Sequence, residues 1–298
     1  MLSRLSPVAL AALGVLLLSG MDAVIKHLSA THSVLAITFG RFLFGAGAAA
    51  LIWNGAGRPA ITGEMVRAHA LRGLLIVVVA STFFFSLSVL ALAEAVTLAF
   101  VAPLLIPLAA WAVVGERPRV RSLLAGGVGF LGALIATQGA PSATQSPHHT
   151  LGVIAVFSSA GAYAWAIALL RTRADKDGAP VVGLLQTSIP CLLAAGPAIA
   201  LSPMPPLADL PWFALMGTLG ASGWYMLINA YGRAEAQRLA PLEFTGLIWA
   251  TTLGFVFFSE TPRPQIYAGA ALIISACVFA EWSERRAALT AQTPIGGD

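Results

Sequence analysis

Polar and aromatic side chains recur at helical spacing inside long apolar stretches of this sequence. The longest series is Thr218, Ser222, Tyr225 and Asn229, whose separations of four, three and four residues place them on one narrow face of a helix. Polar groups in an apolar medium normally face a cavity or another helix, because exposing them to lipid is costly. Hydroxyl and amide groups on such a face can bind the charged ends of a small solute. We therefore predict that this face lines a binding cavity.

Three other apolar stretches carry shorter groups of the same kind, with hydroxyls and aromatic rings close together in the chain. We predict that they form further walls of the same cavity. Hydroxyl groups also join packed transmembrane helices, and Trp and Tyr mark the interfaces of a membrane, so a purely packing role remains open for each. The candidate residues are Thr82, Phe85, Ser86, Ser159, Tyr163, Trp165, Thr245 and Trp249.

Three ionisable residues also lie inside apolar stretches. At 1.5 Å per residue, Asp22 and Arg41 lie roughly 9 and 12 Å deep from the same side, which permits an ion pair between them. A buried charge costs several kcal/mol unless it is compensated. The two residues therefore form either a structural pair or a site for substrate or protons. Glu243 lies just inside a later apolar stretch, near the opposite face of the membrane. There it either extends its carboxylate to solvent or takes part in the coupling of transport.

Two prolines, Pro103 and Pro107, lie four residues apart in the middle of one apolar stretch. Each removes a helical hydrogen bond, so the helix is expected to bend there. Prolines are also tolerated in membrane helices without any special role. A bent helix can serve as a gate, and we predict a gating role for this pair.

The motifs of several other classes of protein are missing from the sequence. There is no Gly-x-x-x-x-Gly-Lys-Ser/Thr phosphate loop, which argues against direct coupling to ATP within this chain. Cys191 and Cys277 lie in apolar stretches, and His148 and His149 in a polar one, without the spacing of a metal site. No Ser/His/Asp or His-Glu-x-x-His arrangement is visible. We therefore expect no metal, no cofactor and no enzymatic activity.

The composition shows what must position these residues. Of 298 residues, 58% are hydrophobic and 10% are charged, whereas a soluble domain carries about 25% charged residues. A helix that crosses a bilayer needs about 20 mainly apolar residues, and the sequence holds ten such runs. The basic residues lie in short connections, so the pI of about 9.5 does not indicate nucleic-acid binding. The predicted spans are residues 7–28, 33–53, 71–92, 95–114, 123–138, 151–170, 181–201, 210–231, 239–259 and 266–280.

Lys and Arg residues set the orientation, because positive charge is retained on the cytoplasmic side. With the N-terminus inside, only Lys26 and Arg263 fall on outer connections. The first apolar run lacks a signal-peptide cleavage site, so we expect a retained span. We predict a multi-pass protein of the bacterial inner membrane with both termini in the cytoplasm. The basic residues of the predicted cytoplasmic stretches are Arg4, Arg58, Arg67, Arg72, Arg117, Arg119, Arg121, Arg171, Arg173, Lys176, Arg233, Arg238, Arg285 and Arg286.

The two halves of the chain carry matching motifs. Because each half holds five spans, an odd number, the halves must lie in the membrane in opposite orientations. Inverted repeats of this kind are typical of secondary transporters, which bind substrate between the halves. We predict a first repeat over residues 1–140, a second, inverted repeat over 151–286 and a cytoplasmic tail over 287–298. The matching motifs are Ala93-Glu94-Ala95 and Ala234-Glu235-Ala236, each followed by Leu-Ala, and Glu116-Arg117-Pro118-Arg119 and Glu260-Thr261-Pro262-Arg263.

Several of these features together resemble a known family. Arg41 within the second span, the turns Gly115-Glu116 and Ser259-Glu260 before each fifth span, and the two halves are similar to the EamA branch of the drug/metabolite transporter superfamily. The second half departs from that pattern at Ser259, where Gly is usual, and has no counterpart of Arg41. The resemblance implies ten helices, with the fifth and tenth standing away from the pocket. Within the branch the chain most resembles bacterial exporters of amino acids, aromatic ones in particular.

The sequence thus predicts an all-α integral membrane protein of ten transmembrane helices, arranged as two inverted five-helix repeats. We expect a secondary transporter that exports amino acids with broad specificity by alternating access. Its partners are a small-molecule substrate and the lipid bilayer, and not nucleic acid; monomer and homodimer both remain open. An exporter of cationic drugs or other small metabolites is the alternative within transport. Outside transport the alternatives are a membrane-embedded lipid-modifying enzyme and a structural or regulatory subunit.

Overall fold

The computed structural model describes residues 5–89, 95, 98–115, 120–137, 148–235 and 239–258, and part of residues 264–282. Within these residues the chain forms helices and turns and no strand. Five helices, α1, α2, α3, α7 and α8, are long and apolar enough to cross a membrane. The expected all-α membrane protein is confirmed. In chain order the helices are α1 (Pro7–Leu28), α2 (Val34–Gly55), α3 (Gly63–Val89), α5 (Ala102–Val114), α6 (Val120–Thr137), α7 (His149–Asp177), α8 (Ala179–Leu201), η2 (Leu207–Asp209), α9 (Leu210–Arg233), η3 (Ala240–Thr245) and α11 (Gly246–Phe258).

Local sequence sets several of the helix ends. The hydroxyl of Ser6 accepts a hydrogen bond from the backbone N–H of Ala9 at 3.1 Å, which caps the start of α1. Ser33 caps α2 in the same way through the N–H of Ala36 at 3.2 Å. Gly115 ends α5 with a φ of 76°, a left-handed conformation that glycine adopts without strain. These signals lie in the chain itself, so they fix the helix ends before any packing occurs.

The third predicted span begins at residue 71, but α3 begins at Gly63. Arg67 and Arg72 therefore both lie on the helix. Arg67 is exposed near its start, whereas Arg72 is only 2% exposed. The predicted place of Arg72 in a connection was wrong, because this charge finds polar partners inside the bundle. The sixth predicted span ends too early as well, since α7 continues to Asp177. The ninth predicted span consists of two elements, the 3-10 helix η3 followed by α11.

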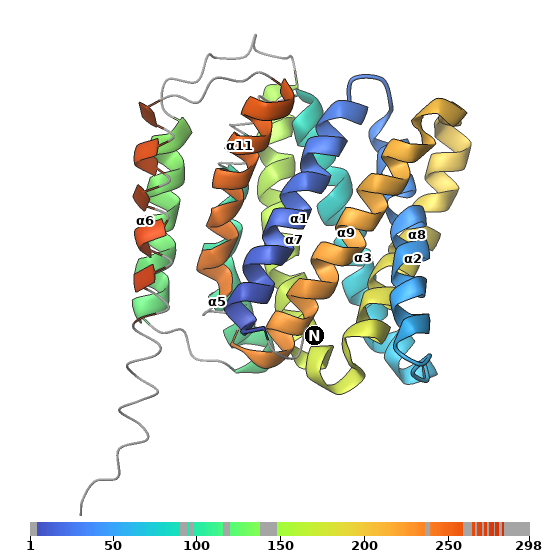
Figure 1. Ribbon diagram of the computed structural model, residues 1–298, viewed down its shortest axis with the longest axis horizontal. Helices are drawn as coiled ribbons and strands as arrows, with labels where there is room; N and C mark the ends of the chain where they lie inside the picture. Colours follow the sequence, from blue (N-terminus) through green and yellow to red (C-terminus); the bar gives the residue numbers. More distant parts are fainter. Residues whose placement is uncertain are drawn as a thin grey trace, which may run out of the picture.

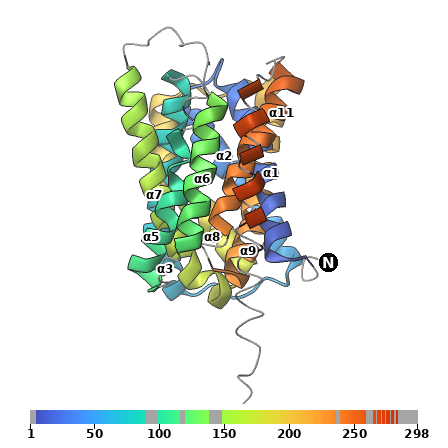
Figure 2. The ribbon, with the colours of Figure 1, turned by 90° about the vertical axis from the view of Figure 1, so that its left-hand side faces the viewer.

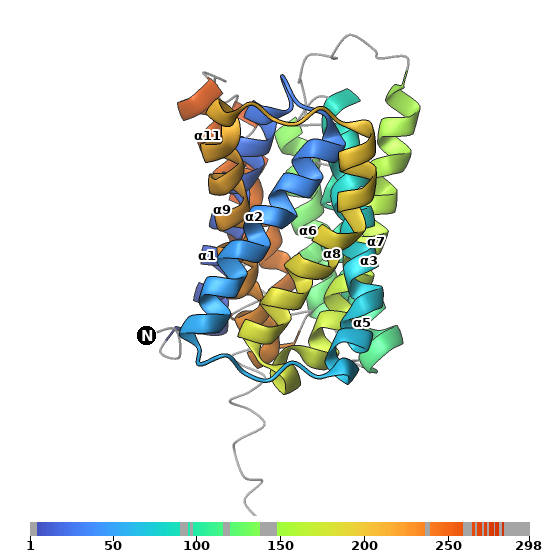
Figure 3. The ribbon, with the colours of Figure 1, turned by 90° about the vertical axis from the view of Figure 1, so that its right-hand side faces the viewer.

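The helices lie side by side along one direction (Figure 1, Figure 3), with α1 packed along α9 and α3 along α7. Helix α2 packs against α8 and α9, α8 also contacts α3, and α5 packs against α7. Helix α6 and the described part of residues 264–282 lie beside each other at one edge of the bundle (Figure 1, Figure 2). These two segments correspond to the fifth and tenth predicted spans, which the family resemblance places away from the pocket.

Glycines let pairs of helices approach until their backbones touch. A Cβ atom added at Gly14 of α1 would lie 2.9 Å from the carbonyl oxygen of Gly223 of α9. One added at Gly217 of α9 would lie 2.6 Å from the backbone nitrogen of Gly45 of α2. Because lipid provides little hydrophobic driving force between helices, close contacts of this kind hold them together. Helices α1, α2 and α9 therefore form one tightly packed group.

Buried side chains close one end of the bundle. Leu10 near the start of α1, Leu170 of α7 and Tyr231 near the end of α9 are fully buried in one cluster, together with Ile106 of α5. A second cluster joins the other half of α1 to α2, α3 and α9, for example through Ile25. The first cluster packs the described parts of α1, α5, α7 and α9 together at the end where α1 begins.

Several sequence predictions fall outside the described residues. They concern the repeat motifs at Glu94, Glu116 and Glu260, the cysteine Cys277 and the tail over 287–298. The count of ten spans and the inverted repeat depend on these parts of the chain.

Candidate functional site

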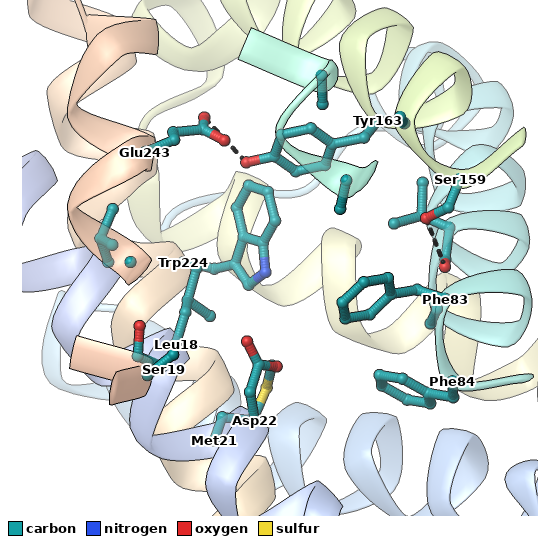
Figure 4. Close-up of a pocket in the computed structure, with 18 of the residues that line it drawn as sticks. Leu18, Ser19, Met21, Asp22, Phe83, Phe84, Ser159, Tyr163, Trp224 and Glu243 are labelled. Atoms are coloured by element: carbon teal, nitrogen blue, oxygen red, sulfur yellow. Dashed lines mark hydrogen bonds between the residues drawn. The ribbon is translucent and has the colours of Figure 1, made fainter. Parts of the chain in front are cut away.

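A cavity of about 270 Å³ lies among α1, α3, α7, α9 and α11. Aromatic rings of Phe83 and Phe84 from α3, Phe100, and Trp224 from α9 form much of its wall. Figure 4 shows Phe83 and Trp224 directed into the same space. The volume is close to the lower end of the range of about 300–1,000 Å³ for small-molecule sites. The cavity can therefore hold a small solute with an apolar or aromatic group.

Glu243 of η3 lies at the end of the cavity where α7 and α9 approach each other. Its carboxylate accepts a hydrogen bond from the hydroxyl of Tyr163 at 3.0 Å (Figure 4). It accepts another from the hydroxyl of Tyr231 at 2.8 Å. The carboxylate points into the bundle, so it does not extend to solvent. These bonds tie η3 to α7 and α9, next to the buried cluster that closes this end.

Asp22 of α1 lines the middle of the cavity (Figure 4). Within the described part of the chain, no hydrogen bond or ion pair engages its carboxylate. Arg41, the expected partner, donates from its Nε to the sulfur of Met21 at 3.1 Å, and its guanidinium lies 4.6 Å from the ring centroid of Phe42. Asp22 and Arg41 interact electrostatically across the cavity wall without direct contact. The carboxylate of Asp22 is thus available to a solute.

The lining carries more basic than acidic side chains among the described residues. Lys26, Arg41 and Arg72 are the basic ones, and Asp22 and Glu243 the acidic ones. Lys26 lies near the C-terminal end of α1, with its Nζ 4.6 Å from the ring centroid of Phe258 of α11. The wall thus offers partners of both signs of charge to a solute.

Two of the twelve residues predicted to bind substrate, Ser159 and Tyr163, line this cavity, and so do Asp22, Arg41 and Glu243. Ser159 also donates from its hydroxyl to the carbonyl oxygen of Val79 at 3.1 Å, which joins α7 to α3.

The other ten residues lie outside the lining. Most of their polar groups are satisfied by a carbonyl three or four residues earlier on the same helix, as Ser, Thr and Asn side chains can be. Thr218 bonds to Ala214, and Asn229 to Tyr225, and Thr82, Ser86 and Thr245 do the same. Trp165 is 48% exposed on the outer surface of the bundle. Tyr225 and Trp249 pack against the first buried cluster, and Phe85 and Ser222 are half-buried.

The two prolines differ in position. Helix α5 begins at Ala102, so Pro103 lies in its first turn, where proline removes no helical hydrogen bond. A turn at residues 100–101 separates the helical residues 98–99 from α5. The helical run is thus interrupted just before Pro103, where we expected a bend. Pro107 lies inside α5, and a gating role for it stays a prediction.

Sequence reasoning missed Phe83, Phe100, Trp224 and Arg72. Trp224 adjoins Tyr225, so only the rotation of α9 about its axis decides which of the two faces the cavity. An aligned comparison of the two halves provides a signal for Phe83. At the offset of 141 residues that separates Ala93 from Ala234, Phe83 corresponds to Trp224.

Residues 5–138 match the model of the EamA-like transporter family. The matched residues make up slightly less than half of the chain. Over 92% of this chain and 95% of the relative, it is 27% identical to the pseudopaline exporter CntI of Pseudomonas aeruginosa. Over 90% and 91%, it is 23% identical to an S-adenosylmethionine uptake transporter of Rickettsia bellii. A riboflavin transporter of Rhizobium johnstonii is 30% identical over 65% of this chain and 63% of the relative.

A solved crystal structure has the same fold as this chain. Its TM-score is 0.77 at 21% identity, over 94% of this chain and 98% of the other. The family and its relatives place the chain among membrane transporters and not among enzymes. The relatives are named for different cargoes and for both export and uptake. The cargo must therefore be argued from the cavity itself.

Proposed function

We propose that this EamA-type protein is a secondary transporter that exports amino acids, aromatic ones included, across the bacterial inner membrane by alternating access. The observation that carries the proposal is an aromatic-walled cavity in which the carboxylate of Asp22 makes no hydrogen bond or ion pair with any described residue. An ammonium group can bind this carboxylate, while the side chain of the cargo stacks on Phe83, Phe84 and Trp224. The mainly apolar wall suits broad specificity.

The charge of the wall argues for amino acids over cationic drugs. A cation-selective site needs an excess of carboxylates, but here Glu243 is already held by Tyr163 and Tyr231, and three basic residues line the same cavity. A zwitterion satisfies both signs of charge at once. We therefore keep cationic cargo only as the alternative that the transport assay below can reveal.

Helix packing supports two inverted repeats of five spans. The contact of α1 with α9 in the bundle has its counterpart in that of α7 with α3, and the contact of α2 with α9 in that of α8 with α3. By the same exchange of the two halves, the contact of α1 with α11 corresponds to that of α7 with α5. Each pair follows if the first span corresponds to the sixth, the second to the seventh and the third to the eighth. At the offset of 141 residues from Ala93 to Ala234, Asp22 corresponds to Tyr163, and both line the cavity.

Alternating access requires the cavity to be closed on one side at a time. The cluster around Leu10 and Tyr231 closes the end where α1 begins, and the bonds of Glu243 lie next to it. At the other end the lining reaches Lys26 and Phe258. With the N-terminus in the cytoplasm, this arrangement corresponds to an outward-facing state.

The orientation can be tested with single cysteines at the two ends of α8. Met204 follows α8 and is 90% exposed, whereas Asp175 is exposed near the end of α7, just before α8 begins. In a chain with Cys191 and Cys277 replaced by alanine, we expect Met204→Cys to react with an impermeant maleimide in intact cells. We expect Asp175→Cys to react only after the membrane is permeabilised. The reverse pattern would refute the cytoplasmic N-terminus.

Transport itself can be tested by counterflow into proteoliposomes that are loaded with unlabelled amino acids. We expect labelled phenylalanine and tryptophan to accumulate transiently, because a carrier exchanges cargo across the membrane. Protein-free liposomes are the control, and runs with and without a pH gradient distinguish proton coupling from exchange. Folded protein that moves a cationic dye but no amino acid would refute the proposal and favour the alternative cargo.

A further inference from the structure

We propose that Arg72 binds the carboxylate of the cargo, so that this transporter requires a carboxylate on its substrate. The inference rests on the proposed function and adds to it a residue that selects the substrate by charge. No sequence motif points to Arg72, and it lies in the wall of the same cavity as Asp22.

The fold holds Arg72 from two sides. Its Nε donates to the carbonyl oxygen of Ala166 of α7 at 3.3 Å, and its Nη2 donates to the side-chain oxygen of Gln186 of α8. The residue is 2% exposed, and its Nη1 is buried without a hydrogen-bond partner in the described structure. One edge of the guanidinium is thus fixed, while donor capacity remains for another group.

Arg72 forms no ion pair with an acidic side chain among the described residues. Asp177 is bound to His69 at 3.0 Å, and Glu243 accepts hydrogen bonds from two tyrosines. Asp22 interacts electrostatically with Arg41. A buried cation without a counter-charge is unfavourable, and charged groups inside membrane proteins commonly mark substrate pathways. The missing anion can be supplied by the cargo.

A carboxylate is the anion that fits this position best. The planar guanidinium matches a carboxylate through two parallel N–H···O bonds. Tyr163 lies within electrostatic range of Arg72 and lines the same cavity, so a group bound at Arg72 adjoins the proposed cargo space.

The first test uses the wild-type protein, so it does not depend on whether a variant folds. Counterflow is measured with phenylalanine, with phenethylamine, which lacks the carboxylate, and with phenylalanine methyl ester. We expect the amine and the ester to be carried at no more than about one tenth of the rate of phenylalanine. The reason is that they lose the charge-assisted hydrogen bonds of a carboxylate, which are the strong ones. Equal rates for the amine and the amino acid would leave transport standing and overturn the role of Arg72. No exchange of any compound would overturn the proposed function and this assignment together.

The second test compares Arg72→Gln, Arg72→Lys and the matched control Arg67→Gln, an exposed residue on the same helix. We expect Arg72→Gln to bring the ratio of phenylalanine to phenethylamine transport close to one. Lysine should restore part of the ratio, because it keeps the charge without the planar fork. Arg67→Gln should keep the wild-type ratio. If Arg72→Gln lowers the melting temperature but keeps the wild-type ratio, Arg72 only joins α3 to α7 and α8, and the proposal is wrong.

Discussion

Replacing Asp22 with asparagine should lower amino-acid counterflow by about 10- to 100-fold while the protein remains folded. The carboxylate lines the cavity, and no described residue makes a hydrogen bond or ion pair with it, so its loss removes a partner of the cargo and breaks no direct bond of the scaffold. A hydrogen bond to a charged group contributes about 1.5–3 kcal/mol, and each 1.4 kcal/mol is about a factor of ten. Initial rates in proteoliposomes and the melting temperature in detergent are measured on the same preparation.

The matched control for this change is Asp175→Asn, which makes the same substitution at an exposed position near the end of α7. It should leave transport unchanged. Exchanging the charges, with arginine at position 22 and aspartate at position 41, should not restore activity, because no direct bond joins Asp22 to Arg41. Recovery in that double variant would show that the two residues are a structural pair, contrary to our proposal.

Replacing Gly217 with alanine should destabilise the fold by about 1–3 kcal/mol, the usual cost of overpacking. The added Cβ would lie 2.5 Å from the Cβ of Phe44, 2.6 Å from the backbone nitrogen of Gly45 and 2.7 Å from the carbonyl carbon of Phe44. Backbone atoms cannot rotate away, so α9 and α2 must separate. Thermal unfolding in detergent, followed by circular dichroism, measures the effect.

Gly47→Ala provides the matched control on α2. A Cβ at Gly47 has no atom within 4 Å, and alanine is favoured over glycine in a helix by up to about 1 kcal/mol. This variant should melt at or slightly above the temperature of the wild type. If Gly217→Ala also melts at or above the temperature of the wild type, α2 and α9 do not pack as closely as described.

The sequence alone was enough to predict the five described helices that are long and apolar enough to cross a membrane, and three of the charged groups of the cavity. An apolar run of about 20 residues has few alternatives to a membrane helix, and an ionisable group inside such a run must find a polar setting. Asp22, Arg41 and Glu243 line the cavity for this reason. Tyr163 and Ser159 were also found, since they share one face of a helix.

Spacing along one helix could not identify the rest of the wall. It shows that Thr218, Ser222, Tyr225 and Asn229 share a face, but only packing decides where that face points. Contacts of α9 with α1 and α2 through its glycines turn Trp224 toward the cavity. The hydroxyl of Thr218 is satisfied by its own helix, so no energetic penalty forces that face inward.

Arg72 is the residue for which the tertiary structure mattered most. In the sequence it stands at the edge of an apolar run, where a charge normally marks the end of a span. Its partners, Ala166 and Gln186, lie 94 and 114 residues away in the chain, and only the folded bundle brings them together. The sequence determined which segments enter the membrane, because hydropathy is local. Which polar groups meet inside the bundle depends on contacts between distant helices, so the tertiary structure alone decided it.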